Sequence, residues 1–245
     1  MSKLLVTGST GQLGRPTTAA LRAAGVDVLG LTRSGGPGAV AHDLRTRRGL
    51  DEAIQGVDTI VHLASTNGRQ DVEMARNLTD SARRAGVAHL VLISIVGIDE
   101  TPLRFYRDRV EIERIALASG VPLTIQRATQ FHSLIDMIFS VQKLPMIFVP
   151  RWRVQPIAVE DVARRLAELA VGAPQGRVDD ISGPEQHSMR DLHTFWKQAT
   201  GSRRPAVMVH LPGRFFAAYD AGANLVPGPG YGTKTFESYL QEKYR

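Results

Sequence analysis

The sequence predicts an α/β fold in which a doubly wound parallel sheet is covered by helices on both faces. Short apolar segments alternate with amphipathic segments through the first half of the 245 residues, as in strand–helix–strand units. The short segments are apolar nearly throughout, which is typical of strands that are covered on both faces. Glycines follow three of the amphipathic segments, at Gly25, Gly86 and Gly120, where left-handed helix caps are expected.

The elements of the first half follow in a regular order. We expect strands at 3–6, 26–31, 39–41, 59–63, 89–93 and 121–126. We expect helices between them at 12–24, 49–54, 72–85 and 105–118. Because helices connect consecutive strands, those strands can lie parallel to one another.

The regular alternation of predicted strands and helices ends after Ala128. We expect helices at 131–141, 159–171 and 188–199, a last strand near 178–181 and a final helix after the Gly/Pro-rich segment 227–230. Ser188 is expected to cap the helix that it begins, with Asp191 in the first turn. We interpret residues 1–245 as a single domain, in which 129–158 and 183–245 form a small C-terminal cap on the substrate side.

Composition excludes several classes of protein. The chain has no cysteine, which excludes a disulfide framework and thiol catalysis. It shows no leader peptide and no apolar segment of the ~20 residues that span a bilayer, so we expect a cytoplasmic protein without a membrane partner. The net charge is +6, but the basic residues lie in scattered pairs such as Arg83 and Arg84. We interpret them as solvated helix faces that attract an anionic cofactor, and expect no nucleic-acid partner.

A glycine-rich turn after the first strand predicts a dinucleotide site. Gly8, Gly11 and Gly14 follow an apolar strand and open a helix. Glycine lets the backbone turn tightly and approach a pyrophosphate, which the free N–H groups and dipole of the following helix stabilise. This context predicts a Rossmann-type fold. The residues expected to contact the cofactor here are Gly8, Ser9, Thr10, Gly11, Gln12, Leu13 and Gly14.

The end of the second strand favours NADP(H) over NAD(H). An acid there would bind the adenosine ribose hydroxyls, but the sequence has Arg33, which can face a 2′-phosphate. Asp43, next to Leu44 after the third strand, can accept a hydrogen bond from adenine or serve as a turn residue. Small residues after the fourth strand would let the backbone lie along the cofactor ribose. The segment concerned is Leu63, Ala64 and Ser65.

The sequence resembles the atypical short-chain dehydrogenase/reductases, in particular the NmrA-like NAD(P)-binding group. The resemblance rests on 7–14 and 42–44, and on the later segments 93–97, 127–131 and 154–163. It implies a Rossmann-type sheet of about seven strands, a bound nicotinamide nucleotide and a small C-terminal substrate region. It also implies cofactor contacts at Ala128, where the sixth strand ends.

The wider superfamily reduces carbonyls with a serine and a Tyr-x-x-x-Lys pair, and this chain departs from that pattern. Ser94 stands at the serine position. In one helix register Arg109 replaces the lysine and Phe105 the tyrosine; in the other, Tyr106 fits but Val110 takes the lysine position. Arg109 can still bind a ribose or phosphate, but its pKa is too high for acid catalysis. The usual carbonyl-reductase mechanism is therefore in doubt.

Four side chains are candidates for the missing proton donor. They are Ser94, Tyr106, Gln130 and His132. Histidine titrates near neutral pH, although His132 can equally be a packing residue, as can Tyr106. Phe131, Met137, Phe139 and Met146 could line an apolar substrate pocket or belong to the core. The histidines, aspartates and glutamates do not show the spacing of metal ligands, so we expect no metal site. The sequence also lacks the G-x-S-x-G nucleophile elbow of hydrolases.

Three functions are compatible with these residues. The first is an NADP(H)-dependent oxidoreductase acting on a small apolar carbonyl, quinone or conjugated acceptor. The second is a non-catalytic sensor of the NADP/NADPH ratio, motivated by the missing pair. The third is a dehydratase or isomerase with His132 as base. The helices at 72–85 and 105–118 are candidates for a homodimer face, as in related folds.

Overall fold

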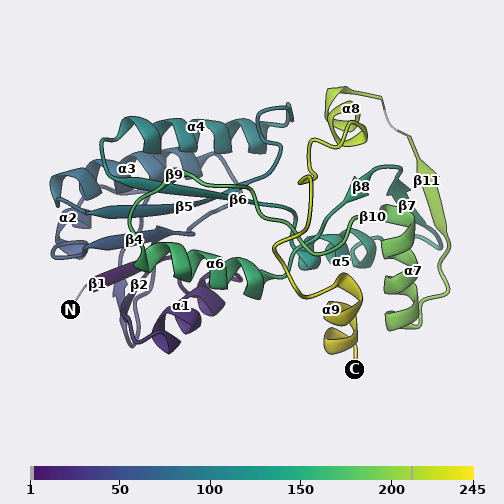
Figure 1. Cartoon of the computed structure of the whole chain (residues 1–245), viewed down its shortest axis with the longest axis horizontal. Helices are drawn as coiled ribbons and strands as arrows, with labels where there is room; N and C mark the ends of the chain where they lie inside the picture. Colours follow the sequence, from purple (N-terminus) through teal and green to yellow (C-terminus); the bar gives the residue numbers. More distant parts are fainter. Residues whose placement is uncertain (1–2, 211) are drawn as a thin grey trace. The chain divides into compact units, whose positions relative to one another are not determined.

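The computed structural model describes residues 3–210 and 212–245 (Figure 1). The chain forms two compact units. The first consists of Met1–Ser94, Arg104–Arg127 and Val162–Asp179. The second consists of Ile95–Leu103, Ala128–Asp161 and Asp180–Arg245, and therefore contains both segments that the sequence analysis assigns to a cap.

A seven-stranded sheet with the order β3-β2-β1-β4-β5-β6-β9 confirms the predicted parallel α/β fold. In register, Leu5 of β1 lies between Leu29 of β2 and Ile60 of β4. The strand order reverses beside β1, which is where open sheets of this kind bind ligands at their carboxyl ends. The strands are β1 (Lys3–Thr7), β2 (Asp27–Thr32), β3 (Ala39–Ala41), β4 (Thr59–His62), β5 (His89–Ile95), β6 (Leu123–Ala128) and β9 (Gly176–Arg177).

Helices cover both faces of this sheet, with α3 and α4 on one face and α1 and α6 on the other (Figure 1). The core of the first unit contains Leu5, Ile60 and Leu90 from the strands and Leu78 and Ile112 from α3 and α4. The three glycines expected at helix ends have φ values of 77°, 68° and 77°, which confirms the left-handed caps. The helices are α1 (Gly14–Ala23), α2 (Leu50–Ala53), α3 (Gln70–Arg84), α4 (Arg104–Ala118) and α6 (Val159–Val171).

The second unit combines short strands with helices. β11 pairs with β7 in parallel, and β10 pairs with β8 antiparallel. Ser188 caps α7 in a reciprocal hydrogen-bond pair with Asp191, which confirms the predicted helix start. Its elements are α5 (His132–Ser140), β7 (Ile147–Pro150), β8 (Arg153–Val154), β10 (His187–Ser188), α7 (Met189–Thr200), β11 (Ala206–Val209), α8 (Arg214–Asp220) and α9 (Phe236–Lys243).

A buried carboxylate ties the C-terminal helix to this unit. Asp136 of α5 is 1% exposed. Its oxygens accept hydrogen bonds from Trp196 Nε1 at 2.9 Å and Tyr244 Oη at 2.8 Å, and from Lys243 Nζ. A buried charge is tolerated when it is paired and fully hydrogen-bonded, so α9 and the residue after it satisfy a group that α5 could not bury alone.

The structure corrects the predicted last strand. It lies at Gly176–Arg177 rather than at 178–181, and pairs with β6 through Thr124 and Gly176. Ile181 makes an isolated bridge to Ala128 instead. The sequence analysis did not predict β7, β8, β10, β11 or α8. Among the described residues, no helix combines the length and apolar character that crossing a bilayer requires.

Candidate cofactor site

The glycine turn is packed so closely that side chains cannot replace Gly8 or Gly14. Gly8 has a φ of 67°, and its N–H donates to the carbonyl of Leu31 at 3.1 Å. A Cβ on Gly14 would lie 2.1 Å from the carbonyl oxygen of Gly8. A Cβ on Gly8 would lie 2.9 Å from the Cα of Ala64. The turn therefore brings the start of α1 and the exit of β4 together.

The start of α1 fits an anionic diphosphate. Among the described residues no side chain caps the helix at Leu13, and its first turn contains no acid. The first N–H groups and the positive end of the helix dipole are thus left for an anion. Arg15 adds a cation here and holds the turn through a 2.9 Å hydrogen bond from Nε to the carbonyl of Thr10. Gln12 and the exposed Gly11 belong to the same turn.

Gly30 is a site residue that the sequence analysis missed. A Cβ at this position of β2 would lie 2.5 Å from the hydroxyl oxygen of Ser9. Glycine here therefore lets Ser9 lie flat against the strand. A glycine inside a strand is the signal that could have revealed this close approach.

The ends of β2 and β3 carry a charged cluster of Arg33, Asp43 and Arg45. Arg45 donates to both carboxylate oxygens of Asp43 from Nε, each at 2.9 Å. These hydrogen bonds lower the pKa of Asp43 to about 2, with a further contribution from the charge of Arg33. Two guanidinium groups and one carboxylate leave the cluster with a net positive charge. Leu44 is buried in the core, and its carbonyl accepts from Asn77 at 2.9 Å.

The exit of β4 is fixed by Thr7, another residue that the sequence analysis missed. Its hydroxyl accepts from the backbone N–H groups of Leu63 at 3.1 Å and Ala64 at 3.2 Å. The same hydroxyl lies 2.8 Å from Nδ1 of His62. Burial lowers the pKa of His62 to about 4, so this imidazole is neutral at physiological pH. Thr7 thereby holds the segment 63–64 beside the glycine turn.

Arg109 does not extend freely into the site, because it forms an ion pair with Asp71 of α3. Asp71 is 2% exposed and also accepts hydrogen bonds from Ser65 Oγ at 2.5 Å and from the N–H of Thr66 at 2.7 Å. Burial alone would raise the pKa of Asp71, but these hydrogen bonds and the charge of Arg109 outweigh it and lower the pKa. Arg109 also donates to Ser65 Oγ at 2.8 Å and lies over the ring of Phe105.

This network fixes the loop between β4 and α3. Within it, Asn67 has a φ of 54°, which non-glycine residues rarely adopt. Two of its neighbours in the loop, Ser65 and Thr66, are held by the carboxylate of Asp71. We infer that Arg109 positions Ser65 beside the cofactor, rather than presenting all of its donors to a ribose or phosphate.

Ser94 and Tyr106 differ in their surroundings. Ser94, near the carboxyl end of β5, is 4% exposed, and its hydroxyl has no hydrogen-bond partner among the described residues. Tyr106 is buried in α4 and meets Phe105 edge to face, with 5.8 Å between ring centroids. An unpaired buried hydroxyl is costly unless a ligand completes it. Ser94 is therefore the better candidate for a ligand contact of these two.

Gln130 and His132 lie in the second unit with Ala128. His132 is 1% exposed, and its Nε2 donates to the carbonyl of Lys234 at 3.0 Å. Burial lowers the pKa of His132 to about 4, and its ring packs against Phe236 and Tyr239. This environment keeps the imidazole neutral and favours a packing role over proton donation near neutral pH.

Three of the residues that could line an apolar substrate pocket differ in their surroundings. Phe139 is fully buried in the core of the second unit, so it packs there. Met137 and Met146 are 48% and 36% exposed, so they do not belong to that core.

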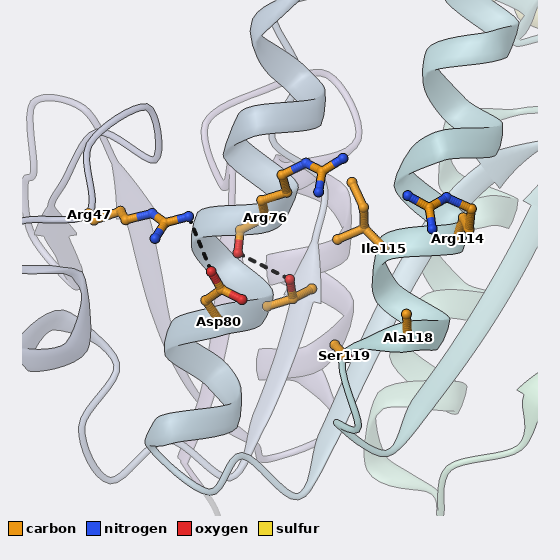
Figure 2. A pocket seen from close by; sticks show the side chains of 8 residues that line it. Arg47, Arg76, Asp80, Arg114, Ile115, Ala118 and Ser119 are labelled. Carbon is orange, nitrogen blue, oxygen red and sulfur yellow. Dashed lines mark hydrogen bonds and ion pairs between the residues drawn. The ribbon is translucent and has the colours of Figure 1, made fainter.

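A pocket of about 260 Å³ lies elsewhere in the first unit, on α3 and α4 (Figure 2). Three arginines line it, but each is paired: Arg47 with Asp80 at 3.2 Å, and Arg76 and Arg114 with Glu111 at 2.5 Å and 2.7 Å. None of the predicted site residues lines this pocket. Within residues 3–210 and 212–245, no three metal-binding side chains gather at one point.

Comparison with known families identifies the family of this chain and its cofactor class. A family model described as NAD(P)H-binding matches residues 8–131, which is more than half of the chain. The chain belongs to the NAD(P)H-binding family. This membership confirms the resemblance to the atypical short-chain dehydrogenase/reductases and the predicted nicotinamide cofactor. That the glycine turn and its neighbours contact this cofactor stays a prediction.

Relatives of this NAD(P)H-binding protein include an enzyme named as a reductase. A (4-alkanoyl-5-oxo-2,5-dihydrofuran-3-yl)methyl phosphate reductase from Streptomyces griseus is 30% identical over 204 residues, which cover 77% of this chain and 70% of the relative.

Solved structures with the same fold include a nucleoside-diphosphate-sugar epimerase from Staphylococcus aureus, with a TM-score of 0.83 and 19% identity over 98% of this chain and 100% of the other. An Escherichia coli NADPH-dependent quinone oxidoreductase complexed with NADPH has a TM-score of 0.81 and 16% identity, over 99% and 100% of the two chains. At these identities the structures show the fold alone.

Proposed function

We propose that this chain is an NADPH-dependent reductase that acts on a conjugated acceptor such as a quinone. The observation that carries the proposal is the pairing of a diphosphate-binding turn with a site that lacks the usual protein acid. Phe105 stands in one of the two possible tyrosine positions, and in that register Arg109 is committed to Asp71. The reductase name of the Streptomyces griseus relative supports a redox reaction over an isomerisation.

The preference for NADPH is supported by the charged cluster of Arg33, Asp43 and Arg45. A 2′-phosphate carries nearly two negative charges and suits guanidinium groups, which bind phosphate with two parallel hydrogen bonds. The carboxylate of Asp43 holds Arg45 in place through its two oxygens. Arg33 is exposed and lies directly after β2, where the phosphate of the adenosine ribose is expected.

A conjugated acceptor fits a site without a strong acid. When bound, the reduced nicotinamide supplies a hydride. A quinone that receives a hydride becomes a delocalised, weakly basic anion, so water can supply the single proton that completes the hydroquinone. The chain then has to position the substrate and exclude side reactions. The unpaired hydroxyl of Ser94 can donate a hydrogen bond to an oxygen of that substrate.

The test is oxidation of NADPH, followed by its absorbance, with menadione, cyclohexenone and benzaldehyde as acceptors. We expect turnover with menadione and little or none with benzaldehyde, whose alkoxide product needs an acid. Replacing Ser94 by Ala should lower kcat/KM by about tenfold, the equivalent of one hydrogen bond. Bound cofactor without oxidation of any acceptor would refute the reductase proposal.

A redox sensor is the second candidate, because the Tyr-x-x-x-Lys pair is absent. A sensor must bind the oxidised and reduced cofactor with different affinities, since a ligand shifts an equilibrium only by its differential affinity. Calorimetric titration with NADP⁺ and with NADPH distinguishes the two functions. Equal affinities together with turnover favour the reductase, whereas strongly unequal affinities without turnover favour the sensor.

A further inference from the structure

The second unit contains a group of four aromatic side chains, here called the aromatic cluster. It consists of Trp152, which lies between β7 and β8, and Phe215, Phe216 and Tyr219 of α8. The ring of Trp152 stacks on Phe216 with 5.5 Å between centroids and 22° between planes. Phe215 meets Trp152 edge to face at 5.3 Å, and Tyr219 lies 4.7 Å from it. Tyr219 is buried, but the other three rings remain partly exposed.

Packing alone is a weak explanation for so many rings on one short helix. α8 has seven residues, and Tyr219 already anchors it with 6% of its surface exposed. Phe215 and Phe216 do not belong to the core of the second unit as far as the described residues show it. Partly exposed aromatic rings that are gathered in one place are typical of surfaces that bind another flat ring.

A buried amide with one unpaired atom lies beside the aromatic cluster. Gln130 is 7% exposed, and its Nε2 donates to the hydroxyl of Tyr219 at 3.3 Å. Its Oε1 is buried and has no hydrogen-bond partner among the described residues. Leaving such an atom unpaired is costly, so its retention calls for a ligand that completes it.

The hydrogen bond to Tyr219 leaves the amide of Gln130 with an acceptor for a ligand. An amide oxygen accepts hydrogen bonds, and Nε2 is already used as a donor to Tyr219. The unpaired Oε1 can therefore accept a hydrogen bond from the hydroxyl of a ligand.

We propose that the aromatic cluster and Gln130 bind the flat ring of a quinone and of its hydroquinone product. This inference rests on the proposed reductase function. In that reaction the quinone receives a hydride from NADPH and a proton from water, so its two C=O groups become C–OH groups while NADPH becomes NADP⁺. The conjugated ring stacks on the pair that Trp152 and Phe216 form with each other. The unpaired Oε1 of Gln130 accepts a hydrogen bond from a hydroxyl of the hydroquinone product.

Steady-state kinetics with two substitutions and one matched control test this proposal. Phe216→Leu and Trp152→Leu should each raise KM for menadione by about five- to tenfold, as expected when an aromatic stacking contact is lost. KM for NADPH and KM for the smaller, non-aromatic cyclohexenone should stay within about twofold. The control is Phe148→Leu, because Phe148 is a 39% exposed phenylalanine of β7 whose loss should change none of these constants. If the rings only pack, both cluster substitutions lower the melting temperature and leave KM for menadione unchanged.

A binding measurement separates failure of this inference from failure of the proposed function. The chain has two tryptophans, Trp152 and the buried Trp196. Menadione added to the NADP⁺-loaded protein, which cannot transfer hydride, should quench tryptophan fluorescence saturably. Trp152→Phe, which keeps Trp196, should lose that saturable part.

Two outcomes are decisive. Saturable quenching at Trp152 without turnover of any acceptor would refute the reductase proposal and leave the ring-binding site standing. Turnover of menadione with unchanged KM in both cluster substitutions, or identical quenching in Trp152→Phe, would overturn the ring-binding site alone.

Discussion

The ion pair between Arg109 and Asp71 allows a quantitative test of how the β4–α3 loop is held. Replacing Arg109 by Met keeps the length of the side chain but removes the guanidinium group. The side chains of Arg109 and Asp71 are 11% and 2% exposed, so the carboxylate would remain buried without its cation. Removing one partner of a buried ion pair costs about 3–5 kcal/mol, and we expect the free energy of unfolding to fall by that amount.

The double substitution separates the ion pair from the packing around it. Asp71→Asn alone should cost about 2–3 kcal/mol, because Arg109 is slightly more exposed and its stem can reach toward solvent. Simple addition predicts a loss of about 5–8 kcal/mol for Arg109→Met with Asp71→Asn. The double variant contains no buried charge, however, so we expect a loss of about 3 kcal/mol and a coupling energy of at least about 2 kcal/mol.

Urea unfolding followed by circular dichroism measures these energies. The matched control is Arg84→Met, since Arg84 pairs with Asp51 at 2.8 Å but both side chains are nearly half exposed. That pair is screened by solvent and should contribute little to stability. A loss for Arg109→Met no larger than that of the control, or a double variant that reaches the sum of the singles, would refute the argument.

Three further predictions follow from the site. Gly14→Ala should weaken NADPH binding at least about 100-fold in a titration, because its Cβ would lie 2.1 Å from the Gly8 carbonyl. Gly172→Ala, whose Cβ would meet only contacts of 3.6 Å and beyond, should bind normally, and equal affinities in the two variants would contradict this reasoning. Arg33→Asp should weaken NADPH much more than NADH, by about tenfold or more, and equal losses would show that Arg33 does not recognise the phosphate. The pKa of His132 is about 4 in the folded chain and about 6.5 in the unfolded chain, so below pH 6.5 the folded state binds fewer protons than the unfolded state. The contribution of His132 to stability is therefore fully present above about pH 6.5, and the free energy of unfolding should fall by about 2 kcal/mol between pH 7 and pH 5 because of this residue. His132→Phe should remove that share from the pH dependence of urea unfolding, and an unchanged pH dependence would be the contrary result.

Local chemistry explains which features could be predicted from the sequence. The glycines that follow helices and the Ser188 cap depend on neighbours in the chain, and their positions were predicted correctly. The pairing of β7 with β11 joins Ile147 to Ala206, and no local periodicity reveals a contact across such a separation. Tertiary contacts decide the register of such short strands.

The candidate site also combines features that depend on neighbouring residues with features that depend on residues far away in the sequence. The glycine turn is local, and the cofactor class that it predicts is confirmed by the family comparison. The role of Arg109 depends on Asp71, which is 38 residues away, and its position in α4 alone indicated only a contact with the cofactor. The neutral state of His132 depends on burial against α9, which a sequence pattern cannot measure.

The buried carboxylate of Asp136 also has a consequence for biosynthesis. Its partners Lys243 and Tyr244 lie 107 and 108 residues further along the chain. A nascent chain folds from its N-terminus as it leaves the ribosome, so these partners are still missing when α5 emerges. The second unit can therefore complete its core only once residues 243 and 244 have been synthesised, and a chain without them would leave the buried carboxylate of Asp136 without two of its hydrogen-bond donors.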